Sequence, residues 1–190
     1  MDPLSALGLA GICMSIIRYA TLSSNGLGTL RQRMRDSEQD IEALRAEVDG
    51  IRTSTEQFRN WLERNPQLDD QQARVIRRTL DAIEGTLVAL ERQIGSLLNS
   101  MRQADEQTAT MTTAGGEQQR QRLPFRRRLS YAWRASDIER YRSRLAAQLQ
   151  VLEFEYRALT RQVAQSFFLT VPSNCTPVTD HCVCKIHKYA

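Results

Sequence analysis

The clearest pattern in this sequence is a single apolar stripe that runs from Ala73 to Met101. Its residues recur at alternating steps of three and four, which is the spacing of one face of an α-helix. Asp69 is suited to cap the start of this helix, and Gln72, three residues later, completes a capping-box pattern. A helix with one apolar face needs a partner to cover that face, so the pattern predicts helix–helix packing. The stripe consists of Ala73, Ile76, Leu80, Ile83, Leu87, Leu90, Ile94, Leu97 and Met101.

A second stripe of the same kind predicts a helix from about Thr29 to Arg64. Asn65 and Pro66 end this helix, and the short hinge that they begin favours an antiparallel return into the next helix. We therefore predict that the two stripes pack on each other within one chain. The alternative is a coiled coil in which both helices pair with other chains. The second stripe consists of Leu30, Met34, Ser37, Ile41, Leu44, Val48, Ile51, Thr55, Phe58 and Leu62.

The N-terminal helix is predicted to differ from the others because no charged residue occurs between Leu4 and Ile17. This uncharged run is shorter than the roughly 20 residues of an ordinary membrane span. The helix is therefore either the buried centre of a soluble bundle or a segment with a role in membrane. Asn25, Gly26 and Gly28 predict a turn after it. The membrane-inserting candidates are Leu4, Leu7, Leu9, Ile12, Ile16, Ile17 and Leu22.

Beyond Met101 the helical periodicity stops and later resumes. Residues 102–124 are rich in Gln, Thr, Ala and Gly and predict a flexible loop. Ser136, with Glu139 three residues later, predicts the start of a last helix, which we expect to end near Phe168. The step from Leu145 to Leu149 directly follows another step of four, whereas strict heptads alternate steps of three and four. This departure favours a globular bundle over a long rod. This stripe consists of Ile138, Tyr141, Leu145, Leu149, Leu152, Tyr156, Leu159, Val163 and Phe167.

The tail, residues 169–190, differs in composition from the rest of the chain. Pro172 and Pro177 exclude regular structure, and we expect a disordered tail. Both histidines and three of the four cysteines lie there, and these are zinc ligands by residue type. Their spacing does not match a zinc finger, so no metal site is predicted. The weak metal candidates are Cys175, His181, Cys182, Cys184 and His187.

Composition narrows the fold and the class of function. The chain has 190 residues, of which 6% are aromatic, and few glycines or prolines. These values suit a single all-α domain, an antiparallel bundle of about four helices. The body lacks a histidine base, and no lysine precedes Lys185, so it also lacks a phosphate-binding lysine loop. We therefore expect no enzyme activity, no cofactor and no small-molecule substrate.

Positive charge is concentrated in one segment. Six arginines lie between positions 120 and 134 without an acidic residue, and they exceed the net charge of +4 of the whole chain. The segment, which also contains aromatic residues, is a solvated bend along the bundle, a contact for anionic lipid, or a nucleic-acid site. Nucleic-acid binding is the least favoured of the three. The lipid-contacting candidates are Arg126, Arg127, Arg128 and Arg134.

Two stretches resemble a known group of fungal proteins. The opening MDPLSALGLAG and the segment LPFRRRLSYAWRASDIERYRSRLAAQLQVLEFEYRAL resemble landmarks of N-terminal domains found ahead of NACHT, ankyrin and related STAND-type modules. The group includes the N-terminal domain of azaphilone-pigment cluster proteins and HeLo-like helical domains, and the likeness spans residues 1–168. The resemblance implies a helical bundle whose apolar N-terminal helix, in HeLo-like relatives, is thought to be released onto membrane during programmed cell death.

The resemblance thus implies a non-catalytic interaction or signalling domain in which the segment from Leu4 to Leu22 inserts into membrane. We expect a protein partner or self-association, and an anionic membrane is a further candidate partner. The expected location is the cytoplasm, with recruitment to membrane. The alternative function is a structural coiled-coil adaptor without membrane activity.

Overall fold

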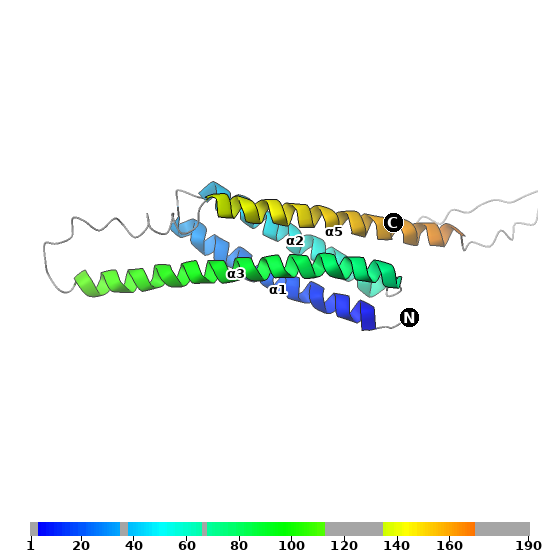
Figure 1. The fold of residues 1–190 in the computed structure, drawn as a ribbon, viewed down its shortest axis with the longest axis horizontal. Coiled ribbons are helices and arrows are strands. Elements are labelled where there is room, and N and C mark those ends of the chain that lie inside the picture. Colours follow the sequence, from blue (N-terminus) through cyan, green and yellow to red (C-terminus); the bar gives the residue numbers. More distant parts are fainter. Residues whose placement is uncertain (1–3, 35–37, 66–67, 113–134, 170–190) are drawn as a thin grey trace, which may run out of the picture. The chain divides into compact units, whose positions relative to one another are not determined.

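The computed structural model describes residues 4–34, 38–65, 68–112 and 135–169, which form four helices and no strand (Figure 1). The predicted all-α bundle is therefore confirmed. The chain divides into two compact units, Met1–Tyr156 and Arg157–Ala190, and the first contains three complete helices and the fourth as far as Tyr156. The helices are α1 (Leu4–Arg33), α2 (Glu38–Arg64), α3 (Asp70–Thr112) and α5 (Ala135–Leu169).

Among the described helices, α1 makes the closest backbone approaches, to α2 on one side and to α3 on the other. Small side chains on its buried face, including Ala20, Ser23 and Ser24, allow this approach. Contacts with α2 run in opposite order along the two helices, whereas contacts with α3 run in the same order. Thus α1 is antiparallel to α2 and parallel to α3. The contacts are Arg31–Glu38 and Met14–Arg59 for α2, and Ser15–Glu84 and Arg33–Asp105 for α3.

In the first unit, α5 lies against both α3 and α2. The Gln148 amide donates to the Ala82 carbonyl at 3.0 Å and to the Thr86 hydroxyl at 3.1 Å, which joins α5 to α3. On the side of α2, a Cβ placed at Gly50 would lie 3.3 Å from the Leu149 side chain. This distance is tight, so the glycine lets the Leu149 side chain lie against α2 without a shift of a few tenths of an ångström.

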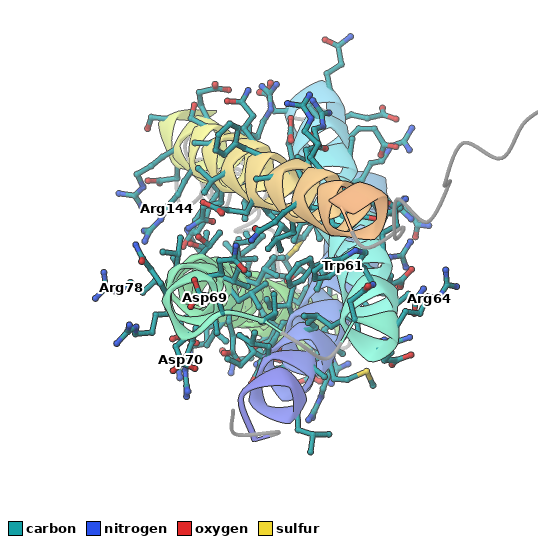
Figure 2. The ribbon with its side chains drawn as sticks, turned by 90° about the vertical axis from the view of Figure 1, so that its right-hand side faces the viewer. Trp61, Arg64, Asp69, Asp70, Arg78 and Arg144 are labelled. Atoms are coloured by element: carbon teal, nitrogen blue, oxygen red, sulfur yellow. The ribbon has the colours of Figure 1, made fainter. Side chains whose placement is uncertain are left out.

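An aromatic cluster joins α5 to the C-terminal half of α2. Phe58 and Trp61 stack with ring centroids 6.1 Å apart, and the Tyr156 ring lies edge-on to both, at 6.2 and 6.3 Å. Phe58 is fully buried, and Figure 2 shows Trp61 on α2 at the end of the helix that also carries Arg64. Because α5 meets Gly50 before it meets Phe58 and Trp61, α5 and α2 run in the same direction.

The predicted stripes form the core of the bundle. All nine residues of the α3 stripe are buried, and so are Ile138, Leu145 and Leu152 of α5. The stripes are buried within one chain, as predicted. The prediction that they pack mainly on each other is wrong, because the closest helix pairs are those of α1 with α2 and with α3, rather than α2 with α3. The buried residues of α2 are Ile41, Leu44, Val48, Ile51, Thr55, Phe58 and Leu62.

The predicted turn at Asn25, Gly26 and Gly28 is wrong, because α1 continues through these residues to Arg33. The second helix accordingly begins at Glu38 and not at Thr29. Leu27, Leu30 and Met34 are buried, so core packing of this segment outweighs the helix-breaking tendency of its glycines. Two basic residues in the last turn of α1 and two acidic residues in the first turn of α2 also complement the helix dipoles at the true boundary.

The predicted start of the loop at residue 102 is also wrong, because α3 continues to Thr112. Arg102, Gln103, Asp105 and Glu106 are exposed, so this part of α3 lacks an apolar stripe from which a helix could be predicted. It is nevertheless rich in residues of good or moderate helix propensity. The rest of the predicted loop, from 113 to 124, lies outside the described residues.

Candidate functional site

The predicted membrane-inserting residues lie on different faces of α1. Two are buried, two are half-buried and two are exposed, while the side chain of Leu4 lies outside the described residues. The structure therefore brings them together on one helix but not on one surface. Leu9 and Ile16 are the buried residues, Ile12 and Ile17 are half-buried, and Leu7 and Leu22 are exposed.

The exposed side of α1 is unusually apolar for a surface in contact with water. Leu7, Met14 and Leu22 are 70%, 53% and 44% exposed and recur about every two turns. Arg18 is the only charged residue among these turns. Among the described residues, Leu7–Arg33 is the one segment long and apolar enough to cross a membrane, although a core helix can meet the same criteria. One third of its most apolar stretch is buried inside the protein.

Side chains of α2 and α3 hydrogen-bond to α1 along its length. In the three pairs that lie before its last turn, the group on α1 is neutral and the group on the neighbouring helix is charged. Detaching α1 at these points therefore leaves no unpaired charge on α1, and charge is what makes transfer into lipid costly. The pairs are Ser15 with Glu84, Met14 with Arg59 at 2.8 Å from the sulfur, and Ser24 with Arg45 at 3.2 Å.

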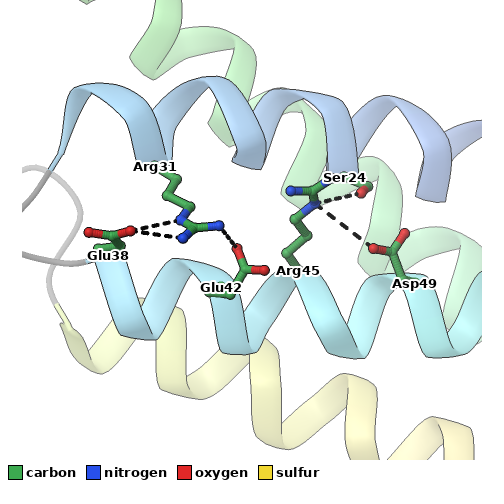
Figure 3. Close-up of polar contacts among 6 residues, drawn as sticks. All are labelled: Ser24, Arg31, Glu38, Glu42, Arg45 and Asp49. Carbon is green, nitrogen blue, oxygen red and sulfur yellow. Dashed lines mark hydrogen bonds and ion pairs between the residues drawn. The ribbon is translucent and has the colours of Figure 1, made fainter.

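An arginine clamp binds the C-terminal end of α1 to the start of α2 (Figure 3). The Arg31 guanidinium donates to Glu38 through Nε and Nη2, at 3.0 and 2.8 Å, and to Glu42 through Nη1, at 2.9 Å. The hydrogen bonds to Glu38, together with the charge of Glu42, raise the pKa of Arg31. All three side chains are 40–48% exposed, so water and salt screen the clamp, which aligns the helices more than it stabilises them.

An open polar recess of about 550 Å³ lies beside the clamp. The two arginines that line it are already paired, since Arg31 binds Glu38 and Glu42 while Arg45 contacts Ser24 and Asp49 (Figure 3). The recess therefore offers no free positive charge to an anionic ligand. Its lining residues are Asn25, Gly28, Thr29, Arg31, Gln32, Glu38 and Arg45.

Two observations concern the reactive side chains within the described residues. Cys13 is fully buried, and burial raises the pKa of its thiol to about 12, so the thiol stays protonated and unreactive near neutral pH. Among the described residues, no group of three or more His, Cys, Asp or Glu side chains could hold a metal ion. The weak metal candidates Cys175, His181, Cys182, Cys184 and His187 and the lipid-contact candidates Arg126, Arg127, Arg128 and Arg134 all lie outside the described residues.

Sequence reasoning missed the arginine clamp because it placed Arg31 and Glu38 on one continuous helix. The signal was nevertheless present in the charges. Arg31 and Arg33 precede Glu38 and Asp40, and this order is typical of one helix ending and the next beginning.

No family model, curated protein or solved structure matches this chain. Within the described residues, α1 is long and apolar enough to cross a membrane. Before its last turn, it hydrogen-bonds to its neighbours through neutral groups of its own. Its charged contacts, those of Arg31 and Arg33, are confined to its last turn.

Proposed function

We propose that this protein is a non-catalytic helical interaction domain of the fungal HeLo-like type, in which α1 passes from the bundle into anionic membrane. The observation that carries the proposal is the composition of α1 together with its contacts. Arg18 is the only charged residue of α1 between Leu4 and Leu30. In this part of the helix, the groups of α1 that hydrogen-bond to α2 and α3 are neutral. The resemblance of residues 1–168 to fungal N-terminal domains supports the same role.

The free energy of moving α1 out of the bundle is favourable only when lipid is present to receive the helix. The buried side of α1 includes Leu9, Ile16 and Leu27, which exchange one apolar environment for another on entering lipid. Exposing the same residues to water would cost roughly 1.5–3 kcal/mol for each side chain. The exposed residues Leu7 and Leu22 gain by leaving water. Membrane is therefore the environment that suits both faces of the helix.

Anionic lipid is the preferred surface because of two basic features of the sequence. Arg18 is exposed on α1 itself, and six arginines lie between positions 120 and 134. Each arginine near an anionic bilayer contributes about 1 kcal/mol of attraction. In this proposal the arginine run recruits the protein to the membrane, and α1 then inserts.

The proposal is tested by dye release from liposomes with the full chain. Wild-type protein releases dye from anionic vesicles and far less from neutral ones. Leu22→Asp places a charge on the exposed face of α1 and lowers the rate at least about tenfold, because a carboxylate in lipid costs roughly 2.5–3.5 kcal/mol. Val75→Asp is the matched control, since Val75 is exposed to a similar extent, 40% against 44%, but lies on α3.

Two results would overturn the proposal. Vesicles that stay intact at every protein concentration would leave the alternative, a structural helical adaptor without membrane activity. Equal loss of release in Leu22→Asp and Val75→Asp would show that α1 is not the segment that meets the lipid. Far-ultraviolet circular dichroism of both variants checks that each keeps its helices.

A further inference from the structure

The outward face of α5 carries a second stripe with heptad spacing. Between Ala135 and Tyr156, exposed side chains recur at positions 140, 144, 147, 151 and 154, in alternating steps of four and three. Val151 and Phe154 on this stripe are 47% and 71% exposed, and Phe154 is the most exposed large apolar side chain described. One exposed apolar residue is ordinary, whereas two neighbours on a heptad stripe form a surface that is stabilised when another helix covers it.

Charge along the same stretch of α5 is uneven. Residues 136–144 contain three arginines and two acidic residues, whereas residues 145–156 contain two glutamates and no basic residue. Two α5 helices lying side by side in the same direction would bring like charges together. In the antiparallel arrangement the basic end of each helix meets the acidic end of the other, so the charge pattern selects antiparallel pairing.

We propose that two copies of this chain form a two-fold dimer through the outward faces of antiparallel α5 helices. When Val151 of each copy lies opposite the small Ala147 of the other, Arg144 falls opposite Phe154 and beside Glu155. The Arg144 guanidinium then stacks on the aromatic ring and pairs with the carboxylate. A two-fold axis uses each of these contacts twice, as in most homodimers.

The monomer leaves the proposed partners available. Arg144 is exposed, and Figure 2 shows it at the outer edge of the bundle. Within the described residues, neither Arg144 nor Glu155 has a hydrogen bond or an ion pair. Arg140 differs, because it pairs with Asp137 at 3.4 Å and lies 5.9 Å from the centre of the Tyr141 ring. Arg144 is therefore the arginine of this stripe that remains free for a partner chain.

The contact area sets the expected strength. The stretch from Arg140 to Tyr156 is about 24 Å long at roughly 1.5 Å per residue. Two helices of this length bury less area than the roughly 1,600 Å² of a standard interface. The dimer is thus expected to be weak, to form at tens of micromolar or above, and to dissociate further in high salt. It uses no residue of α1 and does not depend on the proposed membrane role.

Sedimentation equilibrium of the full chain tests the dimer, with a monomer mass of 21.7 kDa. We expect the mass to rise towards twice this value with concentration. Phe154→Ala should weaken association at least about tenfold, because it removes two aromatic contacts per dimer. Val75→Ala, which shortens an exposed apolar side chain on α3, is the control and should have no effect.

Charge reversal tests the register. Arg144→Glu and Glu155→Arg should each weaken the dimer, because each places like charges opposite one another, and the double variant should restore it. Three results would overturn the proposal: a monomer at every concentration, association that Phe154→Ala leaves unchanged, or a double variant no stronger than the single ones. All substituted side chains lie at the surface, and circular dichroism confirms the fold of each variant.

Discussion

At the scale of single residues, Gly26 sets how closely α1 approaches α3. A Cβ placed at this position would lie 2.5 Å from Cγ2 of Ile94, closer than two such atoms can come. Ile94 is itself buried, and its branched side chain has little rotational freedom in a helix. The glycine, which from the sequence indicated a turn, is therefore a packing residue inside a continuous helix.

Gly26→Ala is accordingly expected to destabilise the protein. Overpacking costs roughly 1–3 kcal/mol, and the better helix propensity of alanine recovers about 1 kcal/mol of it. Gly11→Ala is the matched control on the same helix, since nothing lies within 4 Å of its added Cβ. It should raise the free energy of unfolding by up to about 1 kcal/mol. Urea denaturation of both variants measures the difference, and a gain in stability in both would contradict the close contact.

At the scale of helices, the apolar periodicity of the sequence predicted the stripes, whereas helix boundaries that depend on tertiary packing were predicted wrongly. The α3 stripe was predicted to the residue, and so was the part of the second stripe from Ile41 to Leu62, because these positions lie in the core. Leu30 and Met34, which were assigned to the second helix, instead lie within α1 or directly after it. The boundary between α1 and α2 was misplaced because Gly26 and Gly28 usually signal a turn, whereas burial of Leu27, Leu30 and Met34 in the core keeps this segment helical. Likewise, α3 beyond Met101 continues without an apolar stripe from which to predict it.

The candidate site was predictable only in part. Low charge marks the N-terminal helix in the sequence, but charge cannot separate Leu9, which is buried, from Leu22, which is exposed. That division depends on which side of α1 the other helices cover. The contact of Ser15 with Glu84 joins residues 69 positions apart, and no local pattern reports such a pairing.

The start of α3 is a cap that the sequence did predict. The Asp69 carboxylate accepts a hydrogen bond from the Gln71 amide at 3.2 Å, and the Asp69 carbonyl accepts the first helical bond, from Ala73, at 2.9 Å. Asp69→Ala should lower the free energy of unfolding by about 1 kcal/mol, because it leaves helix amides without this acceptor. Asp69→Asn keeps an acceptor and should stay near wild type. Thermal unfolding followed by circular dichroism compares the two, and an equal loss in both would argue against the cap.

The largest scale is that of the whole bundle, which is the first unit of the chain. Release of α1 from this bundle into water is very unfavourable. The helix buries Leu9, Ile16, Leu27 and Leu30, and α2 and α3 bury the apolar side chains that face it. At roughly 1.5–3 kcal/mol for each large apolar side chain, separation costs as much as the roughly 5–15 kcal/mol that stabilises a typical domain. Without lipid or a partner, losing α1 thus amounts to unfolding the bundle. A membrane changes this balance because it solvates α1 directly.

Hydrogen exchange of the backbone amides can detect this coupling to lipid. In water, we expect the central amides of α1 to exchange as slowly as those of α3, because both open only on global unfolding. With anionic vesicles, α1 should stay protected by lipid, whereas amides of α2 and α3 that it had covered should exchange faster. Neutral vesicles should change neither. If α1 exchanged much faster than α3 in water alone, the helix would not be held as the structure shows. If anionic vesicles left α2 and α3 unchanged, α1 would not leave the bundle on binding lipid.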